Sequence, residues 1–222
     1  MDMLMLEQVT KAGLADWRKM GQGLHARYRT GDFQAGVRFL AALGDVPTDH
    51  VRATIGDNWI DLKLISQDAV HQDQAVEWVT QTDVDLAHRI TGVAASLGLV
   101  ADPASITVLE LALDTARAKE IAPMWAALLT GSTEAQGRGT IGDDVRDLTA
   151  RVPILWFQET DQHDTPRQRF HLDVWVAPEE REARIAAAVA AGGVIVDDSQ
   201  APGFVVLADA DGNKACVCIA TY

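Results

Sequence analysis

ITVLELALDTARAKEIAPMWAALLTG (residues 106–131) and RFHLDVWVAPEEREARIAAAVAAGG (residues 169–193) are two copies of one pattern. Each begins with strand-like alternation, reaches an acidic corner, and continues with apolar residues at helical spacing up to a glycine. Strand-like sequence follows each copy, VPILWFQE at 152–159 and FVVLADADGNKACVCIA at 204–220. The repeat therefore predicts two β-α-β-rich modules. Because one module cannot bury both faces of its sheet, we expect the two to pack as a pair around a cleft.

The stretch GLVADPAS at 98–105 separates this repeat from the sequence before it. Gly98 ends a long helical pattern, and Pro103 stops its continuation. We therefore expect two domains, at residues 1–100 and 105–222.

The first domain combines helical and strand-like patterns. Asp32 precedes a helical segment that ends at Gly44, and residues 50–66 alternate like a half-buried strand. Thr80 with Asp83 three residues later is typical of a helix start. Both domains are thus predicted to be α+β.

Composition excludes several classes of function. The chain has 222 residues, 48% of them hydrophobic, and its 19 basic and 32 acidic residues give a net charge of −13. Such an acidic surface repels nucleic-acid phosphates and anionic membranes. No apolar run is long enough to span a bilayer, and MDMLMLEQVTK at the start has no signal-peptide pattern. We expect a cytoplasmic protein that binds neither nucleic acid nor membranes.

The two cysteines, Cys216 and Cys218, are too few for a disulfide framework. Their C-x-C spacing places both on one face of a strand, where we expect reduced thiols in the core. GRGTIG at 137–142 matches G-x-G-x-x-G, but Asp143 and Asp144 follow at once and would repel a pyrophosphate. We interpret this stretch as a loop.

Four motifs in residues 14–97 resemble the pterin-4α-carbinolamine dehydratases: LADW at 14–17, LHARYRTGDF at 24–33, LISQ at 64–67 and TQTDVDLA at 80–87. The family signature is an acidic residue, a His-His-Pro, an aromatic residue, a third histidine, and an aspartate at the last helix. Its positions here are filled by Asp45, Asp49, His50, Val51, Asp57, Gln67 and Asp83. The resemblance implies the family's antiparallel-sheet fold with a degenerate active site.

Dehydration needs one proton delivered and one removed, and histidine serves both steps near neutral pH. The resemblance makes His50 and Asp49 the catalytic candidates, although Asp49 acts as an acid only if its pKa is strongly raised. Gln67 transfers no proton but can hydrogen-bond a heteroaromatic ring. Trp59 and Asp61 share a polar strand face suited to stacking, to ligand binding or to an interface. The alternative is that His50 is simply a polar residue at a strand start.

Residues 105–222 resemble a glyoxalase-type domain of the vicinal oxygen chelate superfamily, in RVPILWFQ at 151–158, RFHLDVWV at 169–176, AAGG at 190–193 and DADGNKACV at 209–217. The resemblance implies paired βαβββ modules, with metal ligands drawn from the first and last strand of each module. These slots fall on Thr107, Gln158, His171 and Cys216.

Of these four residues, only His171 is a conventional ligand of a catalytic metal. A divalent metal at His171, Gln158 and Cys216 stays open as an alternative, but we expect no cofactor. An organic ligand would instead be held by Trp156, Trp175, Gln158 and His171.

Three functions remain open. The first is binding of a small organic compound, heteroaromatic compounds included, with a metal-independent lyase or isomerase activity. The second is the activity of one parent family, either dehydration of a 4a-hydroxytetrahydropterin or metal-dependent glyoxalase or dioxygenase chemistry. The third is non-catalytic: the first domain forms a homo-oligomer, which we expect in any case, and presents the second domain.

Overall fold

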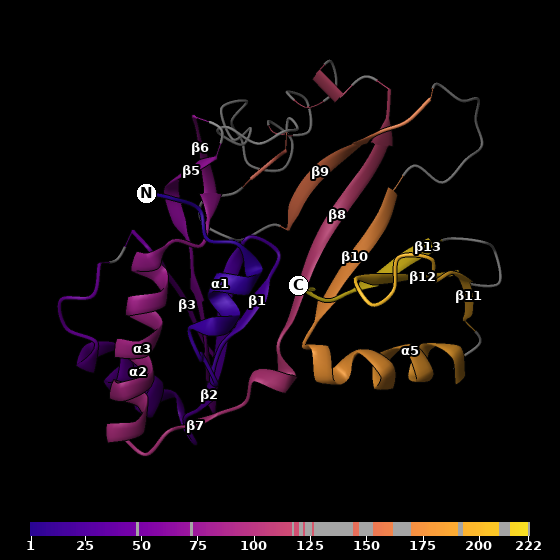
Figure 1. Ribbon diagram of the computed structural model, residues 1–222. Coiled ribbons are helices and arrows are strands. Elements are labelled where there is room, and N and C mark those ends of the chain that lie inside the picture. The colour runs from indigo at the N-terminus through magenta and orange to yellow at the C-terminus, as the bar shows by residue number, and fades with distance from the viewer. Residues whose placement is uncertain are drawn as a thin grey trace. The chain divides into compact units, whose positions relative to one another are not determined.

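The computed structural model describes residues 1–47, 49–71, 73–116, 118–119, 122, 126, 144–146, 153–161, 170–190, 193–208 and 214–221. The chain divides into two compact units. Unit 1 is Met1–Ile106 with the C-terminal end of the chain, and unit 2 is Thr107–Ile219. The division follows directly after the GLVADPAS stretch. Both units mix helices with strands (Figure 1), so the expected α+β architecture is confirmed.

Unit 1 is built from an antiparallel sheet and three helices. Its helices are α1 (Leu6–Lys11), α2 (Phe33–Ala42) and α3 (Gln81–Ser96), and its sheet has the order β1 (Arg18–Met20), β2 (Gly23–Arg29), β4 (Trp59–Leu64), β3 (Val51–Ile55), with β7 (Val100–Ala101) also paired to β2. A separate hairpin joins β5 (Ser66–His71) to β6 (Gln74–Trp78). A short 3-10 turn, η1 (Pro103–Ser105), ends the unit.

The helix ends of unit 1 follow local sequence signals. The Asp32 carboxylate accepts a hydrogen bond from the backbone N–H of Ala35 at 2.6 Å, which caps α2. Thr80 and Asp83 form the predicted capping box at the start of α3. Gly44 and Gly98 follow α2 and α3 with φ of 59° and 69°, a left-handed conformation that suits glycine.

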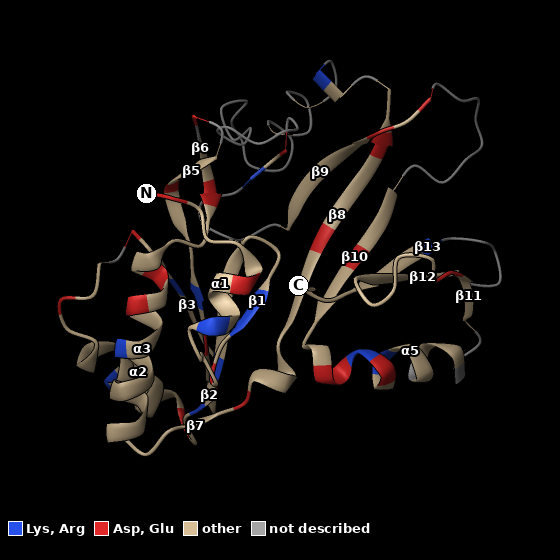
Figure 2. Ribbon diagram, in the orientation of Figure 1, with Lys and Arg blue, Asp and Glu red and all other residues tan. Residues whose placement is uncertain are grey.

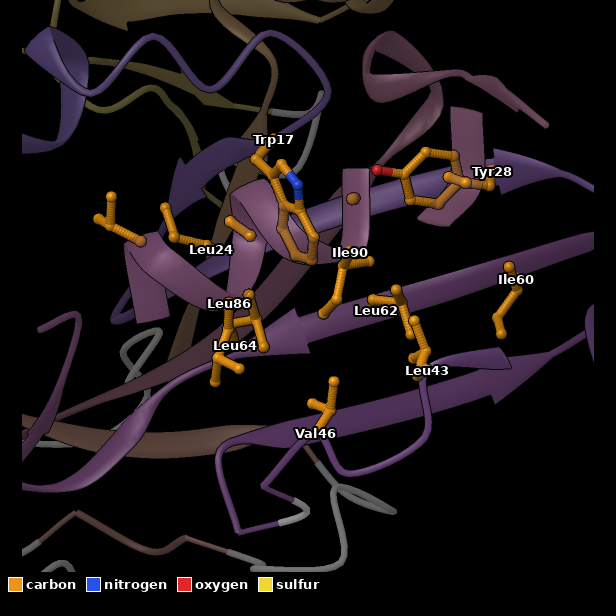
Figure 3. Packing of buried hydrophobic residues seen from close by; sticks show 14 of the residues in the cluster. Trp17, Leu24, Tyr28, Leu43, Val46, Ile60, Leu62, Leu64, Leu86 and Ile90 are labelled. Atoms are coloured by element: carbon orange, nitrogen blue, oxygen red, sulfur yellow. The ribbon is translucent and has the colours of Figure 1, made fainter. Parts of the chain in front are cut away.

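The core of unit 1 lies between the sheet and the helices (Figure 3). Strand β4 alternates as predicted, because Ile60, Leu62 and Leu64 are fully buried while the residues between them are partly exposed. Phe39 of α2 packs against Tyr28 of β2 in an edge-to-face arrangement, with ring centroids 5.4 Å apart.

Unit 2 contains one six-stranded sheet. In spatial order its strands are β11 (Val194–Asp197), β12 (Phe204–Ala208), β13 (Lys214–Cys218), β10 (Phe170–Val176), β8 (Thr107–Thr115) and β9 (Ile154–Glu159). Helix α5 (Arg181–Ala190) follows β10 through the 3-10 turn η3 (Pro178–Glu180).

The strand pairing of unit 2 is that of two modules side by side. Strands β8 and β10, the first of each repeat copy, pair antiparallel in the centre. Each is flanked by a parallel strand, β9 beside β8 and β13 beside β10. The second module runs strand, helix and three strands. Of the first module's helix, residues 118, 119, 122 and 126 are described and are helical.

One face of this sheet is apolar and covered by helices. Ile185 of α5 packs on Val176, Val205, Leu207 and Val217. At the other end, Leu113, Leu155 and Phe157 pack with Ala122, Ala126 and Val145. The helices thus cover one face, and the functional candidates of unit 2 other than Thr107 lie on the other. Among the described residues, no helix is both long enough and apolar enough to cross a membrane.

Candidate functional site

The register of unit 2 places the side chains of six strands on two faces. Asp173 of β10 lies opposite Glu110 of β8 and opposite Cys216 of β13. Directly paired residues share a face, and so does every second residue along each strand. The resulting polar face, as we call it, carries Glu110, Ala112, Asp114, Trp156, Gln158, His171, Asp173, Trp175, Cys216 and Cys218.

Two carboxylates form the centre of the polar face. Glu110 and Asp173 lie directly opposite each other and are 5% and 9% exposed. The indole N–H of Trp175 donates to Glu110 Oε2 at 3.0 Å, and that of Trp156 donates to Asp173 Oδ2 at 3.2 Å. Acidic positions are visible along the adjacent strands β8 and β10 in Figure 2. The two tryptophans therefore hold the two acids in place.

His171 lies between two carboxylates of this face. Its Nδ1 is 3.4 Å from Asp114 Oδ1, and its Nε2 is 3.6 Å from Asp173 Oδ1. The Trp156 ring stands edge-on to the imidazole, with centroids 5.7 Å apart. The side chain of His171 remains 17% exposed. Histidine commonly serves as a general acid or base, and this one lies between carboxylates and remains open to a ligand.

The two cysteines are free, buried and close to Asp173. Cys218 Sγ is 4.0 Å from Asp173 Oδ1. Burial, aided by the negative charge of Asp173, raises the pKa of Cys216 to about 12 and raises that of Cys218 as well. Both are therefore thiols at neutral pH unless a cation binds, in keeping with the expected reduced core cysteines.

Asp173 is a buried acid whose pKa is raised, first because burial removes water from the carboxylate. The folded protein therefore holds this proton at pH values where the unfolded chain has released it. It follows that the stability due to protonated Asp173 is complete below the unfolded pKa and is lost as pH rises through the folded pKa.

Asp173→Asn should therefore stabilise the chelator-treated protein at pH 8 and change little at pH 4. We expect a rise in Tm of about 2–4 °C at pH 8, the shift that about 1 kcal/mol gives a chain of this size. Calorimetry at both pH values measures it, with Asp198→Asn as the exposed control in the same unit. If the Tm of Asp173→Asn falls below that of wild type at pH 8, the raised pKa of Asp173 does not affect stability as expected.

The structure brings most of the sequence-predicted residues of unit 2 together. Trp156, His171, Trp175 and Cys216 lie around Asp173, and Gln158 is exposed on the same face beside Asp114. Thr107 does not join them. It lies on the opposite face, where its hydroxyl is 3.4 Å from Arg184, because a shift of one residue along a strand reverses the side-chain direction.

Sequence reasoning missed the three acids Glu110, Asp114 and Asp173. The sequence signal that could have identified them is the alternation of polar and apolar residues along the strand. His171, Asp173 and Trp175 occupy every second position of a strand, where polar residues facing one side indicate a site rather than a core. The glycine-rich stretch 137–142 lies outside the described residues.

Unit 1 contains a second polar cluster, centred on His50 and Asp83. His50 Nδ1 is 3.0 Å from Asp83 Oδ1, and Ser66 Oγ donates to Asp83 Oδ2 at 2.7 Å. The backbone N–H of Thr80 donates to the same oxygen at 2.8 Å. Ser66, Thr80 and Asp83 are fully buried and His50 is 8% exposed. With Nδ1–H donating to Asp83, the Nε2 atom of His50 is an acceptor.

The other predicted residues of unit 1 lie apart from this cluster. Asp49 is exposed, and its backbone carbonyl accepts from Arg52 at 3.3 Å. Gln67, one residue after buried Ser66 on β5, is exposed. The carboxylate beside His50 is thus that of Asp83. The N–H of Ile65 donates to the His50 carbonyl at 3.1 Å, which places His50 beside Ser66, and Ser66 in turn donates to Asp83.

Trp59 and Asp61 share the strand face that the sequence indicated, on the side of the sheet away from the core. Arg27 of β2 contacts both. Its guanidinium donates two hydrogen bonds to Asp61, each of 2.5 Å, and lies 4.6 Å from the Trp59 ring centroid. In this structure the three side chains are engaged with one another.

The comparison with protein families matches unit 2. Residues 110–218 match the model of a glyoxalase-like domain, a range that includes all the residues of the polar face. A comparison with curated proteins found no match to the chain. The match does not extend to unit 1, whose resemblance to dehydratases stays a prediction. Residues 110–218 are therefore supported as a glyoxalase-like domain.

Proposed function

We propose that unit 2 binds a small organic molecule on its polar face, and that His171 transfers a proton there in a metal-independent lyase or isomerase reaction. The observation that carries the proposal is the position of His171 between Asp114 and Asp173. A partly exposed imidazole between two carboxylates can reach a bound molecule and serve it as a general acid or base.

The surroundings of His171 support binding as well as proton transfer. Trp156 and Trp175 offer apolar ring surface, and their N–H groups are fixed by the central carboxylates. Rigid aromatic walls with a few polar groups are typical of small-molecule sites. Lyases and isomerases need a base that removes a proton from carbon or nitrogen and returns it elsewhere, which is the task that one histidine performs.

The proposal is tested with a fragment library on chelator-treated protein, using the indole N–H signals of Trp156 and Trp175 in ¹H–¹⁵N spectra. We expect organic fragments to shift both signals, and His171→Ala to weaken their binding. His88→Ala, an exposed histidine on α3, is the control and should bind them as wild type does. The proposal fails if no fragment shifts either signal, or if the two variants behave alike.

A divalent metal is the alternative for the same face. His171, Asp173 and Cys216 offer ligand atoms that all lie within 4.8 Å of one another, and a nitrogen, an oxygen and a sulfur donor fit Zn²⁺. These three residues would hold the ion, which would polarise an oxygen of the bound molecule. If this alternative holds, the purified protein contains stoichiometric metal that is lost on His171→Ala. Metal-free protein that still binds fragments excludes it.

The His50–Asp83 pair favours a second function, the dehydration of a 4a-hydroxytetrahydropterin by unit 1. In this proposal Asp83 takes the carboxylate role first given to Asp49, because its Oδ1 lies 3.0 Å from His50 and orients the ring. A direct assay would compare wild type with His50→Ala and His88→Ala. Activity that only His50→Ala removes supports the function. Wild-type turnover at the uncatalysed rate would leave unit 1 as a binding or assembly module.

The third function, assembly, also keeps a supporting observation. Phe33 and Val37 stand one turn apart on α2 and are 49% and 40% exposed. An apolar stripe on a helix is suited to contact with a second copy of the chain. In this proposal, the double variant Phe33→Ser/Val37→Ser is a monomer by light scattering while wild type is an oligomer. A monomeric wild type contradicts it.

A further inference from the structure

The buried centre of the polar face carries more negative than positive charge. Glu110, Asp114 and Asp173 are acids, whereas the basic residues on this side of the described strands are His171 and Lys214, and Lys214 is exposed at the start of β13. Glu110 and Asp173 are more than nine-tenths buried, so water screens little of this charge. A bound anion would be repelled, and a neutral ligand would leave the charge uncompensated.

Two carboxylate oxygens of this face are buried and have no hydrogen-bond partner among the described residues. They are Glu110 Oε1 and Asp114 Oδ1, and the second of these lies 3.4 Å from His171 Nδ1 without forming a hydrogen bond. A buried acceptor without a donor is costly, and native proteins rarely keep one without a reason. Glu110 is the clearer case, since its Oε2 atom already accepts from Trp175 and its Oε1 atom is left over. The unpaired Glu110 Oε1 atom therefore indicates a ligand that donates a hydrogen bond to it.

The spacing of the central acids limits the shape of that donor. Glu110 and Asp173 are directly opposed on adjacent antiparallel strands, where Cβ atoms stand about 4.5–5.5 Å apart. Trp175 and Trp156 fix one oxygen of each acid. A planar group with two N–H bonds in a fork, as in an amidinium or guanidinium, can donate to carboxylates at this separation.

From these observations we infer that the polar face selects an organic cation with paired N–H donors on a flat group, and that Glu110 is its specificity-determining residue. This inference rests on the proposed small-molecule binding at the same face and names the chemical class of the ligand. An aromatic group on the ligand would lie against the ring of Trp156 or Trp175. A cation near either ring would bind more tightly through the cation–π interaction.

The probes are benzamidine and benzamide, which have the same shape and differ in charge and in donor count. Titrations of the full chelator-treated chain by calorimetry and by the two indole N–H signals should show benzamidine binding at least about tenfold tighter than benzamide. Glu110→Gln keeps an acceptor for Trp175 and should lose about tenfold in benzamidine affinity, with benzamide unchanged. Glu182→Gln, 79% exposed on α5, is the matched control and should bind both probes as wild type does.

Four results would overturn the inference, the first three of which concern the probes and the variant. Benzamide could bind as tightly as benzamidine, Glu110→Gln could leave the preference intact, or tetramethylammonium, a cation without N–H bonds, could bind as tightly as benzamidine. If Glu110→Gln fails to fold, Asp114→Asn on the same face replaces it with the same expected loss of preference. A neutral fragment that shifts the indole signals while benzamidine does not would overturn the inference and leave the proposed function standing.

Discussion

Replacing Asp83 by alanine is expected to lower the free energy of unfolding of unit 1 by about 3–5 kcal/mol. Asp83 is fully buried and accepts hydrogen bonds from Ser66 and from the backbone N–H of Thr80, with His50 Nδ1 at 3.0 Å. Alanine leaves these donors buried without an acceptor and also removes the capping box of α3.

Asp85→Ala is the matched control for this prediction. Asp85 lies two residues further along α3, is exposed, and accepts one hydrogen bond from Gln81. We expect it to cost less than about 1 kcal/mol. Urea unfolding followed by hydrogen exchange of peptides from α3 and β4 reports unit 1 separately from unit 2. Equal losses for the two variants would show that the buried network around Asp83 is not what stabilises the start of α3.

Phe39→Ala is expected to lower the free energy of unfolding of unit 1 by a similar amount, about 3–5 kcal/mol. Phe39 is completely buried beneath the sheet, and its ring meets the edge of Tyr28. Removing it leaves a cavity in a core whose other large members, among them Tyr28 and Ile60, are held by strand backbone and cannot move in to fill it.

Phe33→Ala tests whether burial, rather than the loss of an aromatic ring from α2, explains the effect. Phe33 begins the same helix and is 49% exposed. In the same unfolding experiment, Phe33→Ala should lower the free energy of unfolding by less than about 1 kcal/mol. If the two phenylalanine variants unfold at the same urea concentration, the core described for unit 1 is wrong.

Local patterns predicted the elements of the fold well. The alternation of residues 59–64 appears as β4 with Ile60, Leu62 and Leu64 inward, and Thr80 with Asp83 caps α3 as expected. These signals succeed because they depend on residues a few positions apart. The internal repeat indicated two modules, and the first strands of the two copies, β8 and β10, pair with each other in the structure.

Local sequence patterns did not predict which residues of the candidate sites contact each other. His50 and His171 were both found from the sequence, but their carboxylate partners were not. His50 meets Asp83, 33 residues further along the chain, rather than its neighbour Asp49. Thr107 lies on the helix-covered face, because its position on β8 is an odd number of residues from Glu110. Partners of this kind depend on strand register and on packing, which a single sequence does not specify.

The central claim is that the polar face of unit 2 binds an organic molecule beside His171 without a metal. A crystal structure of the chelator-treated chain, soaked with the tightest-binding fragment, tests it most directly. We expect fragment density on the polar face, within hydrogen-bond distance of His171 or Glu110 and against Trp156 or Trp175. Fragment density confined to another surface would contradict the claim, and so would a metal ion retained by His171, Asp173 and Cys216.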